Sequence, residues 1–338
     1  MPDRWSFLAP PADPAVAPLP APPSFSVVVA AYQAQDTIDE ALGSVLSQTR
    51  PPFEIVVCDD GSTDGTAERV RAYGDAVRLV SRENGGEAAA KNTAVQAARG
   101  EFVVVLDADD AWLPDRLEAL GALACARPDL DVLLTDAAVE ADGAFVRLAY
   151  HEGWPFEVHD QAREVLRRNF VLGMAGVRRS RWLAVGGFDE QVRLTTDWDF
   201  FLRLLLSGSR VGLVDAPLAR YRLRADSLSA DRVAMVESRI GTLQRAEARG
   251  GLTPGQLSGL HASLAAQRVE LAARRLDGAL GAGSPQVRRL AARALVVRGS
   301  SWRPRAHALL ALALPRRAAA RTGRRGREIG AGVVVRDA

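Results

Sequence analysis

A valine-rich run that ends in carboxylates most constrains the fold of this 338-residue chain. Residues 102–106 (FVVVL) are apolar throughout, which predicts a strand buried on both faces of a sheet. The run ends in Asp107-Ala108-Asp109-Asp110. Such close carboxylates repel one another unless solvent, a cation or hydrogen-bond donors compensate them. At a strand's carboxyl end they suit Mg²⁺ or Mn²⁺ bound with substrate phosphates, whereas the structural alternative is a solvated turn in which Asp110 caps the next helix.

The rest of the chain alternates apolar runs with helical patterns. The expected strands are 25–31, 54–58, 77–80, 132–135, 170–177 and an edge strand at 210–214. The expected helices are about 37–48, about 66–73, the segment carrying Lys91 and Asn92, and 196–207. This alternation predicts an α/β fold with a doubly wound, mostly parallel sheet and flanking helices. In such sheets ligands bind beyond the carboxyl ends of the strands, which is where the acidic clusters at 59–60 and 107–110 fall.

Composition divides the chain further. Residues 1–23 hold eight of the 18 prolines, which predicts a disordered proline-rich leader. From about residue 230 to 338 the composition shifts to Ala, Arg and Leu with leucines at helical spacing, so a helical extension is expected there. Arginines cluster at 303–327 beside a short apolar segment. That basic tail is either solvated or a peripheral contact with an anionic membrane.

Charge and cysteine content limit the compartment and the partners. The net charge of +2 argues against general nucleic-acid binding. Cys58 and Cys125 lack metal-ligand spacing and favour a reducing compartment, so a cytoplasmic protein is expected, with the inner face of the membrane as the peripheral alternative. No apolar run reaches the length of a transmembrane helix, and the N-terminus lacks the features of a signal peptide.

Three stretches in order carry a family resemblance: VVVAAYQAQDTIDEALGSVLSQT, EIVVCDDGSTDGT and GGEAAAKNTAVQAARGEFVVVLDADDAWLP. Together they resemble the nucleotide-binding half of a family 2 glycosyltransferase, here 24–116. The segments VGGFDE, TTDWDFFLRL and YRLRADSLS resemble the acceptor half, 117–229. The resemblance implies a GT-A fold over 24–229. It also implies inverting transfer of a sugar from a nucleotide-diphosphate sugar, with UDP as the expected nucleotide and usually with Mg²⁺ or Mn²⁺, as in cell-envelope polysaccharide biosynthesis.

The resemblance also implies roles for the first half's residues. Asp60 corresponds to the aspartate that accepts a hydrogen bond from the base, and backbone at Ala30 with the ring of Tyr32 lines the base pocket. Asp107 holds ribose hydroxyls or the metal's water shell, and Asp109 is the direct metal ligand. The structural alternative for Asp60 is turn and capping chemistry.

Further residues contact the donor or the acceptor. Gly86 lets backbone approach the donor. Lys91 pairs with aspartates or phosphates, unless it is only a solvated helix charge. Asp197 is the candidate general base; its helix-N-terminal position is expected to lower its pKa, and the alternative is a first-turn helix residue. Asp199 is expected to be structural. Arg224 stands where the family often has histidine. A guanidinium cannot ligate a metal but can clamp phosphate oxygens, so Arg224 would partly replace the metal's role.

Two other functions remain open on sequence alone. Thr196 replaces the family's acidic neighbour of the base, so a sugar-nucleotide binding module without catalysis is the first alternative. A nucleotidyltransferase is the second, although AYQAQDT lacks the glycine-rich basic loop which such enzymes carry after their first strand. No G-x-G-x-x-G follows that strand, which disfavours a dinucleotide oxidoreductase. The expected partners are a nucleotide sugar and a carbohydrate or lipid-linked acceptor.

Overall fold

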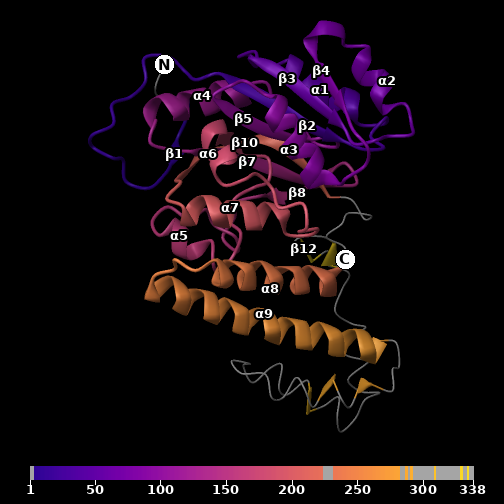
Figure 1. The fold of residues 1–338 in the computed structure, drawn as a ribbon, viewed down its shortest axis with the longest axis vertical. Coiled ribbons are helices and arrows are strands. Elements are labelled where there is room, and N and C mark those ends of the chain that lie inside the picture. The colour runs from indigo at the N-terminus through magenta and orange to yellow at the C-terminus, as the bar shows by residue number, and fades with distance from the viewer. Residues whose placement is uncertain are drawn as a thin grey trace. The chain divides into compact units, whose positions relative to one another are not determined.

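The computed structural model describes residues 4–223, 231–281, 286–287, 290–291, 308–309, 328–329 and 333–334. The chain forms two compact units (Figure 1). The first runs to Val165 and continues from Asn169 to Arg222; the second holds Leu166–Arg168 and the chain from Leu223 onward. Arg224 and most of the basic tail lie outside the described residues.

The first unit contains the large sheet and its helices. Its strands are β1 (Phe7–Leu8), β2 (Phe25–Ala31), β3 (Glu54–Asp59), β4 (Arg78–Ser81), β5 (Phe102–Asp107), β6 (Ala111–Trp112), β7 (Val132–Ala141), β8 (Ala144–Leu148), β9 (Gly176–Arg178) and β10 (Val211–Leu223). Its helices are α1 (Ile38–Leu46), α2 (Thr66–Arg71), the 3-10 helix Gly74–Ala76, α3 (Glu87–Ala97), α4 (Arg116–Ala126), α5 (Gln161–Glu164), α6 (Arg179–Ala184) and α7 (Thr196–Leu206).

The sheet has the strand order β1-β10-β7-β9-β5-β2-β3-β4, with β6 on β10 and β8 on β7. The pairings of β2 with β3, β2 with β5 and β3 with β4 are parallel, whereas β9 runs antiparallel to β5 and β7. The chain places β3 and β4 on one side of β2 and then β5 on the other. The carboxyl ends of β2 and β5 therefore form a topological switch point, where sheets of this kind bind ligands.

The strands at the switch point are the most apolar of the sequence, and their burial explains the fold. Val27, Val28 and Val29 of β2 are inaccessible to solvent, as are Val103 and Val104 of β5. Helices α2 and α3 pack against the β3 side of the sheet and α4 against β7, while α3 also contacts β2 (Figure 1). The expected α/β sheet is thus confirmed.

The structure differs from the expectation of a disordered leader. Residues 4–23 are part of the first unit, and β1 within them pairs antiparallel with β10. Proline carbonyls in this segment accept hydrogen bonds from arginines: Arg210 donates to Pro11, and Arg50 donates to Pro22 at 3.3 Å. Proline has no N–H to leave unsatisfied, so an extended segment can dock through its carbonyls alone.

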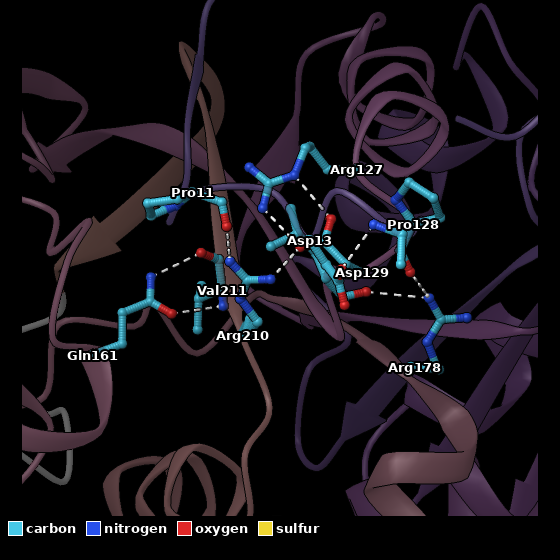
Figure 2. A network of polar contacts seen from close by, with 11 residues as sticks. Pro11, Asp13, Arg127, Pro128, Asp129, Gln161, Arg178, Arg210 and Val211 are labelled. Carbon is cyan, nitrogen blue, oxygen red and sulfur yellow. Dashed lines mark hydrogen bonds and ion pairs between the residues drawn. The ribbon is translucent and has the colours of Figure 1, made fainter. Parts of the chain in front are cut away.

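A polar network fixes the start of β10 beside this leader (Figure 2). Asp129 accepts two hydrogen bonds of 2.8 Å from Arg127 and pairs with Arg210 at 2.5 Å. These arginines, Arg127 first, lower the pKa of Asp129. The amide of Gln161 accepts from and donates to the backbone of Val211 at 2.9 and 2.8 Å.

Three expectations, two beyond residue 130 and one at Asp110, were wrong at least in part. The strand predicted at 170–177 pairs only over β9, because Tyr150 and Arg116 side chains bond its earlier carbonyls at 2.8 and 2.7 Å instead of a neighbouring strand. The predicted edge strand at 210–214 is the first part of the longer β10, and β1 covers it. Asp110 does not cap α4; the N-cap position is Asp115, without a side-chain cap bond.

The described part of the second unit consists mainly of two long helices. It contains α8 (Arg232–Arg249) and α9 (Pro254–Gly281), which lie side by side (Figure 1), and the short strands β11 (Glu328–Ile329) and β12 (Val333–Val334). Asp231 caps α8 by accepting from two backbone N–H groups at 3.0 Å. Ion pairs such as Arg275 with Glu237 at 2.5 Å link the two helices. Among the described residues, no helix combines the length and apolarity needed to cross a bilayer.

Candidate active site

The strands at the switch point end level with one another. In the register of the sheet, Ala30 of β2 lies beside Asp107 of β5 and Cys58 of β3. Tyr32 follows β2 directly and is 53% exposed, so its ring is available to a ligand at this edge. Three of the predicted residues, Ala30, Tyr32 and Asp107, are therefore brought to one edge of the sheet.

The loop after β3 is hydrogen-bonded to the loop after β2. The backbone N–H of Ser62 donates to Oδ1 of Asp59 at 3.2 Å, a side-chain contact typical of turns. Side chains of Gln33 and Gln35 accept from the backbone of the 62–66 segment at 2.7 and 3.0 Å. In the opposite direction, the carboxylate of Asp64 accepts a hydrogen bond from the backbone N–H of Gln35 at 3.2 Å. The two loops consequently form one rigid rim.

Asp60 is buried and joins this rim to the loop before α3. Its two oxygens accept backbone hydrogen bonds from Gly85 at 3.0 Å and from Gly86 at 2.7 Å. Arg82 lies 3.2 Å from the same carboxylate. Gly86 has φ +90°, a value that glycine adopts readily, and precedes the first turn of α3. The carboxylate thus has a structural role in holding this loop. Its contact with the nucleobase of the donor remains a prediction.

Lys91 is buried in α3 and lies between two carboxylates. Its Nζ is 2.6 Å from Asp107 and 2.5 Å from Glu87. Burial opposes a charged ammonium, but Asp107 and Glu87 outweigh it, so the pKa of Lys91 is raised. The solvated-charge alternative for Lys91 is wrong; the residue is paired with one of the predicted aspartates.

The turn after β5 concentrates negative charge. Asp110 is 1% exposed and accepts a hydrogen bond from the backbone N–H of Arg222 on β10 at 2.9 Å. Its second oxygen, Oδ2, has no hydrogen-bond partner among the described residues. Burial and then the charge of Asp107 raise the pKa of Asp110 well above its ordinary value, and Asp109 adds to this. The phenol of Tyr221 faces the same group, and burial and these carboxylates raise its pKa.

The donor set of this turn fits a hard divalent cation. Asp107 and Asp109 place negative charge close to Asp110, whose Oδ2 is buried without a hydrogen-bond partner among the described residues. A cation would compensate this charge. Within the described ranges no group of three or more His, Cys, Asp or Glu side chains could enclose a metal by itself. Mg²⁺ commonly takes one or two protein carboxylates and completes its shell with substrate phosphates and water.

Asp197 comes to this site from the second half of the unit. It lies in the first turn of α7, and its carboxyl is close enough to Glu87, Lys91 and Asp107 for their charges to affect it. The expected lowering of its pKa is wrong. Burial raises the pKa of Asp197, and Glu87 and Asp107 add to the rise against the opposing N–H of Trp198 and the charge of Lys91. Desolvation exceeds the modest effect of a helix terminus.

Asp199, two residues further along α7, is fully buried and pairs with Arg203 at 2.8 Å. It therefore occupies the structural position that its spacing predicts.

Sequence reasoning missed four residues of this site. Asn92, next to Lys91 on α3, clamps the backbone of Phe188 in the Gly-Gly-Phe-Asp-Glu loop, donating at 2.9 Å and accepting at 2.8 Å. The others are Glu87, Tyr221 and Asn169, which donates to Asp197 at 2.8 Å. The only signal for them in the sequence is the glycine pair at 186–187, and in the structure both glycines have a positive φ.

Comparison with known proteins identifies the family of one region of this chain. Residues 26–181 match the sequence model of glycosyl transferase family 2. This region is a family 2 glycosyltransferase domain. Over 195 residues, 54% of this chain, the sequence is 33% identical to a chondroitin synthase of Pasteurella multocida. It is 29% identical over 219 residues to a putative teichuronic acid biosynthesis glycosyltransferase, TuaG, of Bacillus subtilis. The alignment spans 19% of the chondroitin synthase and 83% of TuaG.

Solved structures show the same GT-A fold. S. aureus TarS 1-349 in complex with UDP superposes with a TM-score of 0.58 at 20% identity, covering 91% of this chain and 95% of that one. The mannosyltransferase PcManGT of Pyrobaculum calidifontis, in complex with GDP-Man and Mn²⁺, gives 0.54 at 24% identity, covering 94% and 87%. The family 2 domain of this chain thus has the GT-A fold.

Proposed function

We propose that the protein is an inverting glycosyltransferase that moves a sugar from a UDP-linked donor to the hydroxyl of a carbohydrate or lipid-linked acceptor. One observation carries the proposal: Asp197 from α7 faces Asp107 and Lys91 at the switch point between β2 and β5. The proposed general base, Asp197 of the acceptor half, would thereby lie beside the proposed phosphate-binding residues of the nucleotide-binding half. Relatives named for chondroitin, teichuronic acid and succinoglycan synthesis support a role in cell-envelope polysaccharide biosynthesis.

The donor would be held by the rim of the first half. The ring of Tyr32 packs against the base, and Asp60 keeps the Gly85–Gly86 loop in place and accepts from the base edge. Lys91 and Asp107 face the ribose and the diphosphate. Arg224, which lies outside the described residues, would clamp phosphate oxygens from the second half. The complex of TarS with UDP-GlcNAc supports a UDP-linked donor.

The reaction itself depends on Asp197. Its ionised carboxylate accepts the acceptor hydroxyl's proton as the oxygen attacks the anomeric carbon, from the side opposite the departing diphosphate, and this inverts the configuration. The positive charge of Lys91, beside Asp107, would stabilise the negative charge of the diphosphate. Asp109, with Asp107 beside it, would hold Mg²⁺ or Mn²⁺. When bound, that ion neutralises charge on the departing nucleoside diphosphate.

The test is turnover with a panel of nucleotide sugars and Mn²⁺, in the parent and in Asp197→Asn. The substitution keeps the shape of the side chain and removes its basicity, so kcat should fall by about 10²–10⁴-fold. The Kd for UDP-sugar should change by less than about threefold, because a group that acts in the transition state leaves ground-state binding alone. Donor binding without transfer to any acceptor would instead favour the non-catalytic binding module.

We also propose that the arginine-rich stretch 303–327 attaches the enzyme to an anionic membrane, where a lipid-linked acceptor would lie. Each basic residue near such a surface contributes about 1 kcal/mol. Sedimentation with anionic vesicles at low and high salt tests this. Equal recovery of the full chain and of residues 1–300 in the pellet would exclude it.

A further inference from the structure

Asn169 lies directly beside the carboxylate that we propose as the base. Its side-chain Nδ2 donates to Oδ2 of Asp197 at 2.8 Å. Its Oδ1 accepts a hydrogen bond from the backbone N–H of Val171 at 3.2 Å. Because a backbone N–H can only donate, the second bond determines the orientation of the amide. The group that faces Asp197 is therefore an N–H donor.

The backbone around Asn169 is held by packing and hydrogen bonds. Phe170, the next residue, is inaccessible to solvent, and its carbonyl accepts from the hydroxyl of Tyr150 at 2.8 Å. On the other side, the indole N–H of Trp198, the neighbour of Asp197, donates to the carbonyl of Val165 at 2.7 Å. The segment before β9 and the first turn of α7 are thus fixed to each other, so the amide meets the carboxylate in a defined geometry.

We propose that Asn169 is a positioning residue for the general base: it holds Oδ2 of Asp197 and leaves Oδ1 to accept the proton of the acceptor hydroxyl. This inference rests on the proposed function. The base works only when ionised, and most of its charged neighbours oppose ionisation. Glu87 of α3 and Asp107 at the end of β5 do so, whereas Lys91 favours the ionised form; the neutral phenol of Tyr221 on β10 also faces it. A donated N–H favours the charged carboxylate.

The isosteric variant Asn169→Asp separates this role from a structural one. An aspartate keeps the shape and an oxygen for the N–H of Val171, but it places a second carboxylate against Asp197 in place of a donor. The pH profile of kcat should then have its acid limb at higher pH. We expect a shift of about one unit in Asn169→Ala, from the lost hydrogen bond to a charged group, and a larger shift in Asn169→Asp.

The donor affinity provides an internal check, because it should stay within about threefold in both variants. Gln161→Glu is the matched control: it makes the same amide-to-acid change at a buried side chain that also accepts from a backbone N–H, away from the site. Its acid limb should coincide with that of the parent. Asn169→Ser, which retains a hydroxyl donor, should lie between the parent and Asn169→Asp, and it serves if the aspartate variant does not fold.

A double-mutant cycle completes the test. With Asp197→Asn already present, Asn169→Ala should change the residual rate by less than about threefold, since the group it acts on is gone. Additive losses would show a structural role and overturn the proposal. If the parent is active and the acid limb is unshifted in both Asn169→Asp and Asn169→Ser, the role of Asn169 is refuted while the proposed function stands. A parent that transfers no sugar to any acceptor would refute the proposed function and this role together.

Discussion

Replacing Lys91 by methionine should destabilise the protein through the carboxylates that it leaves behind. Methionine fills a similar volume without charge, so the change removes the ion pairs with Asp107 and Glu87. The Lys91 side chain is 7% exposed, Asp107 30% and Glu87 57%. The Glu87 pair is mostly solvated and should contribute less than about 1 kcal/mol.

The Asp107 pair decides the magnitude. Removing one partner of a fully buried pair costs about 3–5 kcal/mol, but water reaches Asp107 and screens its remaining charge. We therefore expect the free energy of unfolding to fall by about 2 kcal/mol, or Tm by about 4–8 °C. The raised pKa of Lys91 means that this contribution is complete below the ordinary lysine pKa and is lost only as pH rises through the higher folded value. The difference should thus be constant between pH 6 and 8.

Urea and thermal unfolding followed by circular dichroism measure this difference. Lys91→Arg keeps the charge and should recover most of the loss, whereas Arg71→Met, which breaks an exposed pair with Glu68, should change stability by less than about 0.5 kcal/mol. The reasoning fails if Lys91→Met is as stable as the parent, or if the methionine and arginine variants are equally destabilised.

Three further substitutions test other parts of the site. Asp199→Asn, at the fully buried partner of Arg203, should lower the free energy of unfolding by about 3 kcal/mol in urea melts and affect the folded enzyme's kcat little; a stable but inactive variant would exchange the roles of Asp199 and Asp197. Asp60→Asn should speed amide hydrogen exchange at Gly85 and weaken UDP binding with or without metal, and unchanged exchange would contradict its role in the loop. Asp109→Asn should weaken UDP binding only when Mn²⁺ is present, as calorimetry can show; equal losses with and without the ion would argue against a metal ligand.

The sequence predicted most where burial and periodicity act together. The first strand was expected at 25–31, as observed for β2, because valines buried on both faces leave little choice of structure. The hairpin of β7 and β8 was missed although Asp142-Gly143, both with positive φ, is a strong turn signal. The neighbouring run 170–177 looked like a strand, yet side chains from elsewhere satisfy its backbone.

The site was predictable only in part, for a related reason. Motifs place Asp107 and Asp197 in the sequence, but nothing in the local pattern shows that Asn169 meets a carboxylate 28 residues away. The direction of the pKa shift of Asp197 was wrong because a helix terminus is visible in the sequence, whereas the burial of the carboxyl depends on segments distant from it. Pair contacts across the fold are what single-sequence reasoning lacks.

The small strand β1 has a practical consequence for anyone who expresses this domain. The family match begins at residue 26, and a truncation designed from it would delete β1 with the rest of the leader. Strand β10 would then present unpaired N–H and C=O groups along Leu213 and Val214, at an edge of the sheet. Exposed margins of this kind recruit strands from other molecules. A protein shortened to the boundary of the family match should therefore self-associate, whereas one that retains residues 4–23 should stay monodisperse in light scattering.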